Sequence, residues 1–179
     1  GVHETPGKVL DITKIMAENP DYLGSDYLYE NADKFHYWGE PLYGYYCSAD
    51  PWVITRHVEL MMAMGIDFLV YDYTNATAYN KEADAIFEVL QNFRDQGFNV
   101  PKVTFYTNTR SADVVCGLYR RYYEKGLYKD LWYAPDGKPM IIGVSEDGLI
   151  SAQNRELYAM LKEDFFDFRE SQWPDGKTT

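Results

Sequence analysis

The sequence predicts an α/β protein built around a parallel sheet. Helical and extended patterns alternate four times, each expected strand ends in polar residues, and glycine follows three of the helical patterns. The expected strands begin near residues 67, 102, 139 and 164. This spacing is typical of βα repeats joined by right-handed crossovers.

Residues 1–50 are expected to form a loop-rich N-terminal part of one domain spanning residues 1–179. Residues 9–18 carry a short helical pattern, with a capping residue near its start and Asn19-Pro20 at its end. Residues 21–34 carry tyrosines and acids without periodicity. We interpret them as an ordered loop that covers one end of the domain or contacts substrate.

A capped helix and a strand follow in residues 50–75. Asp50 is a suitable N-cap for a helix that begins at Pro51, and Gly65 is a suitable C-terminal residue. Residues 66–71 are apolar with little alternation, which predicts a strand covered on both faces. The side chains expected on the buried face of the helix are Val53, His57, Leu60, Met61 and Met64.

The remaining elements continue the alternation. Helices are expected over residues 80–96, from the N-cap Ser111 to the turn before Gly126, and over residues 151–162. Strands are expected over residues 102–107, 139–144 and 164–169. The buried positions of the first of these helices are expected to be Ala83, Ile86, Val89, Leu90 and Phe93.

Composition narrows the function classes. The net charge of −11 disfavours binding to nucleic-acid phosphates, and no apolar run is long enough to span a bilayer. Cys47 and Cys116 lack metal-ligand spacing, which leaves buried free thiols or a disulfide. Three histidines without a clustered pair give no sign of a metal site, and no cofactor is expected. The 30 aromatic residues in 179 suit a carbohydrate cleft, because sugar rings stack on aromatic planes.

Two architectures fit the repeats: an open doubly wound sheet, or part of a (β/α)₈ barrel of the TIM type. No glycine-rich phosphate-binding motif follows any expected strand, which disfavours a nucleotide-binding open sheet. The barrel typically needs about 250 residues and eight strands, whereas four strands are expected here.

Several segments in order carry a family resemblance: HYWGEPLYGYY, DPWVITRH, GIDFLVYDYTN, FYTNT and GLYKDLWYAPDGKPMII. Together they resemble the glycoside hydrolase family 71/99-like group, which includes endo-acting α-mannosidases and related bacterial barrel proteins. The resemblance covers roughly residues 9–170. It implies a (β/α)₈ fold and glycan processing, and hence a secreted or periplasmic location.

The resemblance also implies an incomplete barrel. A first strand would precede His3, and residues 1–3 look like the remnant of that strand's end. The last strands would follow Trp173. The remainder of the polypeptide, or a second copy of this chain, is therefore an expected partner. Family 99 proteins carry a catalytic glutamate pair late in the barrel, and neither glutamate matches a position here. The resemblance therefore gives a fold and a substrate class but no catalytic residue.

Acids that follow expected strands are the candidates for chemistry, because glycosidases use two carboxylates as acid and as base or nucleophile. Asp72 ends the first strand, Glu146 follows the third, and Glu170 follows the fourth. Asp72 would bind sugar hydroxyls or assist catalysis, and otherwise it would bond to neighbouring backbone N–H groups. Most other acids in this chain are expected to be solvated.

Candidate carbohydrate-binding residues combine aromatic planes with hydrogen-bonding groups. The loop before residue 50 supplies His36, Trp38, Glu40 and Tyr46; the strand ends and later loops supply Asn75, Tyr106, Asn108, Trp132 and Arg169. His57, on a helix face, is interpreted as a core histidine. We expect a glycoside-hydrolase-like barrel that hydrolyses or binds an α-linked glycan. The alternatives are a non-catalytic glycan-binding barrel and a barrel of polysaccharide biosynthesis that is associated with glycosyltransferases.

Overall fold

The computed structural model describes residues 10–21, 36–37, 39–77 and 79–172. The chain forms two compact units, residues 1–54 and 55–179, and each is taken by itself. The expected loop at residues 21–34 and the expected strand remnant at residues 1–3 lie outside the described residues, apart from Asp21.

The first unit contains a short parallel pair of strands. β1 (Leu10–Asp11) pairs with β2 (His36–Tyr37), and α1 (Ile12–Glu18) follows β1 directly. Asp11 is the N-cap of α1, because its carboxylate accepts a hydrogen bond of 3.2 Å from the N–H of Lys14. The same carboxylate accepts a bond of 2.6 Å from the Tyr45 hydroxyl, which ties the loop before α3 to the start of α1.

α3 (Pro51–Ala63) begins and ends as the sequence predicts. Asp50 Oδ1 accepts hydrogen bonds from the N–H groups of Trp52 and Val53, and Gly65 takes a φ of +71°. The predicted buried face is wrong in part, because Leu60 and Met64 are 52% and 68% exposed. The buried side chains are Val53, Ile54 and Val58.

The second unit contains a four-stranded parallel sheet. Its strands are β3 (Phe68–Tyr73), β4 (Lys102–Thr107), β5 (Met140–Gly143) and β6 (Asp167–Glu170), in the spatial order β3-β4-β5-β6. All neighbouring pairs are parallel, which confirms the α/β class and the expected strand positions to within a few residues. In the segment that connects β4 to β5, Trp132 forms an isolated parallel bridge with Val103 of β4.

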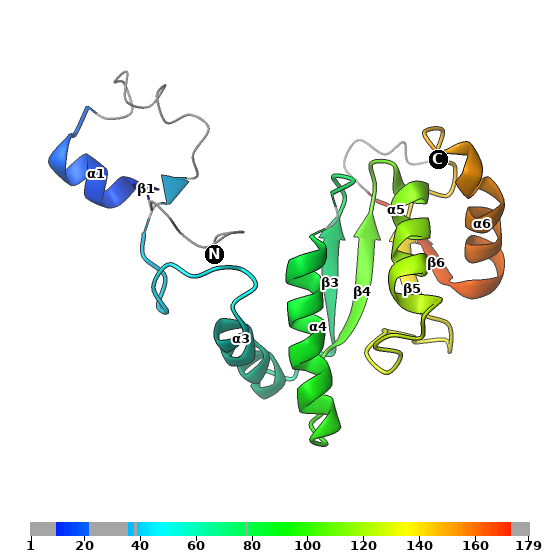
Figure 1. Cartoon of the computed structure of the whole chain (residues 1–179), viewed down its shortest axis with the longest axis horizontal. Coiled ribbons are helices and arrows are strands. Elements are labelled where there is room, and N and C mark those ends of the chain that lie inside the picture. The colour runs from blue at the N-terminus through cyan, green and yellow to red at the C-terminus, as the bar shows by residue number, and fades with distance from the viewer. Residues whose placement is uncertain (1–9, 22–35, 38, 78, 173–179) are drawn as a thin grey trace. The chain divides into compact units, whose positions relative to one another are not determined.

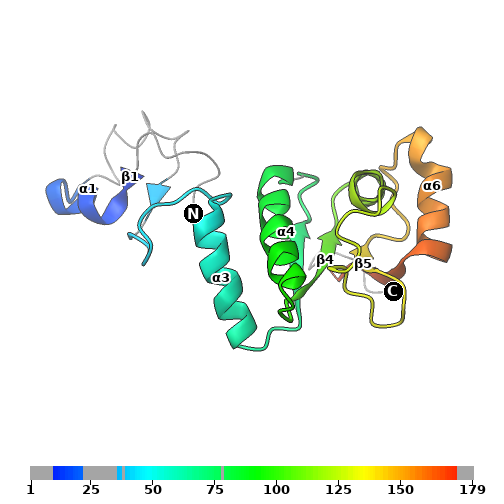
Figure 2. The same ribbon diagram turned by 60° about the horizontal axis from the view of Figure 1, so that its bottom comes forward.

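Helices connect the strands. α4 (Asn80–Asp95) joins β3 to β4, and α5 (Ser111–Leu118) leads into the π-helical turn η2 (Tyr119–Tyr123) before β5. The turn η3 (Ala152–Asn154), α6 (Arg155–Met160) and the π-helical turn η4 (Leu161–Phe165) precede β6. Because the strands are sequential neighbours and such crossovers are right-handed, all three connections lie on one face of the sheet (Figures 1 and 2).

An aromatic core fills the space between the sheet and these helices. The ring of Phe87 on α4 packs against Tyr71 and Phe105 of the sheet, with centroids 5.3 Å and 6.1 Å away. It also contacts Tyr122 on η2 and Trp132, at 5.4 Å and 5.5 Å. The buried positions that the sequence predicts for α4 do not include Phe87. Phe87 lies one helical turn from both Ala83 and Leu90, and all three side chains are buried.

The opposite side of the sheet, here called the open face, is formed on β3 by Phe68, Val70 and Asp72. Val70 is 48% exposed, so the prediction that this strand is covered on both faces is wrong. The physical reason is position: β3 is an end strand of the four-stranded sheet, and its connecting helices cover only the other face.

Candidate functional site

The polar ends of the four strands meet at one edge of the sheet, as expected for parallel strands. The register places Asp72 beside Tyr106, Tyr106 beside Ile142, and Ile142 beside Arg169. In-register neighbours project to the same face of a sheet. Asp72, Tyr106 and Arg169 therefore share the open face near its carboxyl end, and we call these three residues the strand-end row.

Asp72 is held by the turn that follows β3. Its Oδ1 accepts hydrogen bonds from the Thr74 hydroxyl at 2.7 Å and from the Thr74 N–H at 2.9 Å. The hydroxyl bond and then the N–H bond lower the pKa of Asp72 below its usual value. Asp72 is therefore an ionised hydrogen-bond acceptor at neutral pH and is poorly suited to act as a general acid.

Tyr106 and Asn108 lie against the segment after β6. The Tyr106 hydroxyl accepts a bond of 3.1 Å from the N–H of Gln172, and Asn108 Oδ1 accepts one of 3.0 Å from the Ser171 hydroxyl. These bonds connect the end of β4 to the end of β6 across β5. The amide nitrogen of Asn108 has no described partner.

Arg169 and Glu170 leave β6 on opposite faces, because successive residues of a strand alternate. Arg169 forms ion pairs with Asp167 at 2.9 Å and Asp136 at 3.3 Å. Glu170 instead turns towards the loop after β5, where its carboxylate accepts bonds of 3.1 Å and 3.3 Å from the Ser145 N–H.

This geometry separates the candidate carboxylates. Asp72 and Glu170 lie on the two outer strands, three strand spacings or about 14 Å apart across the sheet. Glycosidase carboxyl pairs are about 5–9.5 Å apart. Glu146 is exposed in the loop after β5 and has no hydrogen bond among the described residues. Asp72 and Glu170 therefore do not form a glycosidase pair, whereas the Glu170 carboxylate lies beside Ser145, the residue that precedes Glu146.

The other predicted binding residues scatter. Asn75 is exposed after β3, whereas Trp132 is only 7% exposed and packs in the aromatic core. In the first unit, Glu40 forms an ion pair of 3.2 Å with Lys14, and Tyr46 is half-buried. Trp38 and the side chain of His36 lie outside the described residues.

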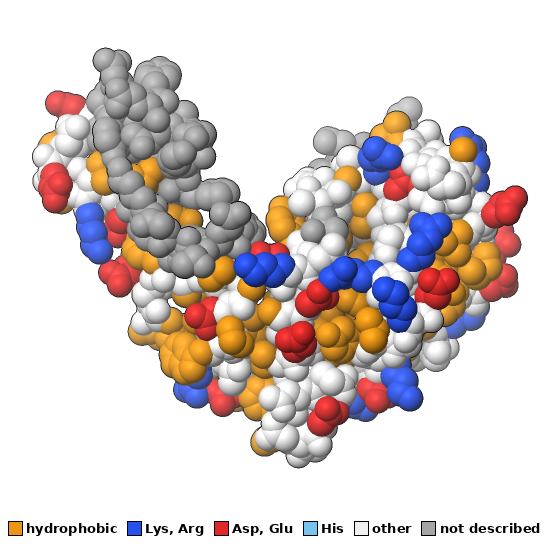
Figure 3. Space-filling view, in the orientation of Figure 1, with side chains coloured by type: hydrophobic (Ala, Val, Ile, Leu, Met, Phe, Trp, Pro, Cys, Tyr) orange, Lys and Arg blue, Asp and Glu red, His pale blue; other side chains and the backbone are white. Residues whose placement is uncertain are grey.

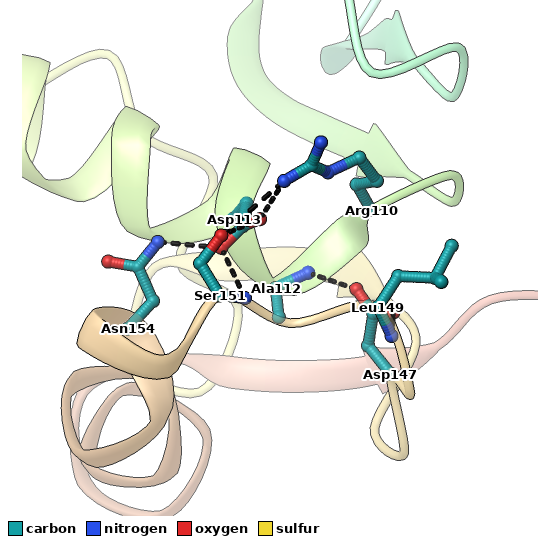
Figure 4. A network of polar contacts seen from close by, with 7 residues as sticks. All are labelled: Arg110, Ala112, Asp113, Asp147, Leu149, Ser151 and Asn154. Carbon is teal, nitrogen blue, oxygen red and sulfur yellow. Dashed lines mark hydrogen bonds and ion pairs between the residues drawn. The ribbon is translucent and has the colours of Figure 1, made fainter.

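A second polar network joins the start of α5 to the turn η3 (Figure 4). Asp113 accepts hydrogen bonds from Arg110 at 2.8 Å, from the Ser151 hydroxyl at 2.7 Å and from Asn154 at 2.7 Å. Asp147, an acid of the loop after β5, accepts a bond of 2.9 Å from the N–H of Ala112. Asp147 therefore caps α5 from a distant segment.

Ser111 is not the N-cap that the sequence predicted. Arg110 occupies that position with a φ of +50°, and Ser111 is the first helical residue. The Ser111 hydroxyl instead shares a bond of 2.7 Å with the Thr107 hydroxyl and accepts one of 2.9 Å from the N–H of Val144. It thus fixes α5 to the ends of β4 and β5.

The arginines at the two ends of the α5–η2 helix were missed by the sequence analysis. Arg110 immediately precedes α5 and Arg121 lies within η2, and both line the same pocket. Their spacing of eleven residues, close to three helical turns, was the available signal.

The cysteines and the acids give no further chemistry. Cys47 and Cys116 do not form a disulfide with each other, and burial raises the pKa of Cys116 to about 11, which disfavours a reactive thiolate. Among the described residues, no three His, Cys, Asp or Glu side chains are grouped where they could hold a metal ion. No helix in the described part of the chain is both long enough and apolar enough to cross a membrane.

Comparison with known proteins gives no match: no family model, no curated protein and no solved structure matches this chain.

Proposed function

We propose that the chain binds an α-linked glycan on the open face of its sheet, as part of a glycoside-hydrolase-like barrel. The observation that carries this proposal is the strand-end row: Asp72, Tyr106 and Arg169 share one face at the carboxyl end of three parallel strands. A carboxylate, a phenol and a guanidinium supply both acceptors and donors for sugar hydroxyls, and the phenol also supplies a ring for stacking.

The one-sided covering of the sheet supports the barrel. A doubly wound sheet has helices on both faces, whereas a (β/α)₈ barrel has them only on the outside. In a barrel the open face would line the interior. Apolar side chains at its amino end fit such a packed interior: Phe68 stacks on Tyr133 with ring centroids 4.1 Å apart.

The barrel proposal also specifies partners. β3 is an end strand of its sheet and can pair with a further strand. We propose that the remainder of the polypeptide, or a second copy of the chain, supplies it. A secreted or periplasmic location follows from the proposed substrate.

Binding is favoured over catalysis by these 179 residues. The separation of about 14 Å between Asp72 and Glu170 leaves a glycan bound at the strand-end row without a glutamate of β6 to face Asp72. Hydrolysis remains the second proposal for a longer polypeptide that adds a second acid to the rim. A role in polysaccharide biosynthesis would use the same binding surface.

Calorimetric titration with α-mannan and α-glucan oligosaccharides tests the proposal, with chromatography of the same mixtures to detect products. We expect binding without product release. Arg169→Gln should weaken binding about tenfold, because a hydrogen bond to a charged group is lost. Arg155→Gln is the matched control, an exposed arginine on α6 that is remote from the strand-end row.

Equal weakening by both substitutions would contradict binding at the strand-end row. The absence of any binding would contradict the carbohydrate assignment altogether. Product release would replace binding by hydrolysis as the function.

A further inference from the structure

A cleft of about 570 Å³ lies between the N-terminal end of α4 and the α5–η2 helix, on the helix-covered side of the sheet. Its polar lining comes from Tyr73, Asn80, Arg110, Asp113 and Arg121. Basic side chains appear over α5 and the adjoining part of α4 in the space-filling view (Figure 3). Because Tyr73 alternates with Asp72 along β3, the cleft and the strand-end row lie on opposite faces of the sheet.

Two buried polar atoms in the lining of this cleft have no hydrogen-bond partner. Tyr73 is 1% exposed, and its hydroxyl is unpaired; the Nε of Arg121 is likewise buried and unpaired. Burial, and then the charge of Asp84, raise the pKa of Tyr73 to about 12, so its hydroxyl is a neutral donor at physiological pH. A buried donor left unpaired costs free energy, and a bound acceptor would remove that cost.

The other donors of the cleft come from helix ends. α4 has 16 residues, and its first residue, Asn80, lines the cleft, so the positive end of the helix dipole lies beside the cleft, with Glu82 as the acid of the first turn. The side chain of Asn80 has no described partner. Arg110 occupies a left-handed backbone conformation, with a φ of +50°, at the start of α5. Ala76, which also lines the cleft, has a positive φ of +57°, and strained backbone of this kind clusters at functional sites.

The acids near the cleft are already paired. Asp113 accepts four hydrogen bonds, from Arg110, Asn154 and both the hydroxyl and N–H of Ser151. Asp84 accepts bonds from an Nη of Arg121 and from the Tyr122 hydroxyl. Arg110 also donates to the Ser151 hydroxyl at 3.4 Å, and Arg121 also bonds to Tyr122. The N–H groups that these acceptors do not use are left for a ligand. Apolar side chains complete the lining: Ala76, Val114 and Leu118.

We propose that this cleft, the α4–α5 cleft, binds a phosphate monoester. The phosphate accepts bonds from Arg110 and the N-terminal end of α4, and after a local opening of the cleft it accepts bonds from the Tyr73 hydroxyl and Arg121 Nε, which are closed to water in the free protein. The three terminal oxygens of a phosphate offer these four donor sources more acceptor positions than the two oxygens of a carboxylate, which have about four in all. The organic part of the ester packs on the apolar wall. The proposal does not depend on the carbohydrate function.

Calorimetric titration of the 179-residue chain with phenyl phosphate tests the proposal, with inorganic phosphate and benzoate as comparison ligands. We expect one phenyl phosphate per chain, with weaker binding of inorganic phosphate and at least tenfold weaker binding of benzoate. Tyr73→Phe should weaken phenyl phosphate binding about tenfold. Because the unpaired Tyr73 hydroxyl costs free energy in the free protein, this variant should have a urea unfolding midpoint at least as high as that of the parent.

Arg110→Gly gives an independent variant, because glycine adopts the left-handed conformation without strain and the fold should be kept. It should also weaken binding about tenfold, whereas the control Arg155→Gln should not. No binding of phenyl phosphate, equal weakening by Arg155→Gln, or unchanged binding by Tyr73→Phe would each overturn the proposal. Benzoate binding as tight as that of phenyl phosphate would replace the phosphate monoester by a carboxylate.

Discussion

The carboxylate of Asp113 shows how one side chain can join two segments far apart in the sequence. It lies on α5, and its hydrogen-bond donors Ser151 and Asn154 belong to the turn η3 and the residue before it. Burial by itself raises the pKa of Asp113, but hydrogen bonds from Asn154, Arg110 and Ser151 outweigh it and hold the pKa well below its usual value.

Asp113→Asn should therefore lower the free energy of unfolding at pH 7 by about 2–3 kcal/mol, because it weakens charge-assisted bonds in a partly buried network. Since the folded-state pKa is depressed, this stabilisation is complete above the unfolded pKa of about 4 and is lost as pH falls below it. Urea unfolding at pH 7 and pH 3 measures both effects. A variant as stable as the parent at pH 7 would contradict this role. So would a variant that loses as much unfolding free energy as the parent does between pH 7 and pH 3.

The role of a strand residue depends on the face of the sheet to which its side chain projects. The sequence alone does not give this face for the candidate site residues. Parallel strands predicted that Asp72, Asn108 and Glu170 would reach one edge, and they do. The alternation of β6 relative to β5 then sends Arg169 to the open face and Glu170 away from it. That register depends on long-range pairing, which a single sequence does not show.

The start of α5 packs closely on the sheet at Gly143. At Gly143 of β5, an added Cβ would lie 2.7 Å from Ser111 Oγ, 3.0 Å from Thr107 Oγ1 and 3.1 Å from Phe168 Cζ. These atoms belong to α5, β4 and β6, so a hydrogen atom in place of a side chain allows the four elements to meet.

Gly143→Ala should cost about 1–3 kcal/mol of unfolding free energy, because the added methyl overpacks this contact. Chemical denaturation measures the loss. Gly148→Ala is a matched control, since nothing lies within 4 Å of the corresponding Cβ. If both variants proved equally stable, the close packing of α5 on β5 would be contradicted.

Element types and limits were largely predictable because each has a local signal. Asp50 and Gly65 mark the two ends of α3, and the pattern of residues 102–107 coincides with β4. Burial was less predictable, because it depends on what lies beside an element. β3 has an apolar sequence typical of a central strand, yet it is the end strand of the described sheet. The start of α5 was also unpredictable from local sequence. Its N-cap residue is Arg110, and the first turn of α5 donates a hydrogen bond to Asp147, an acid far away in the sequence.

At the scale of the whole molecule, the sheet divides the second unit into two chemically different sides. The helix-covered side holds the aromatic core and the α4–α5 cleft, and the open face holds the strand-end row. The two proposals therefore predict different ligands on opposite faces. Variants of one site should leave binding at the other unchanged, because no side chain is shared between them.

Amide chemical-shift mapping with an α-linked manno-oligosaccharide tests the central claim most directly. The account predicts that signals of Asp72, Tyr106 and Arg169 shift with a common saturation curve, while those of Asn80 and Arg121 in the α4–α5 cleft stay in place. Shifts confined to the helix-covered side, or no shifts at saturating sugar, would contradict a carbohydrate surface on the open face.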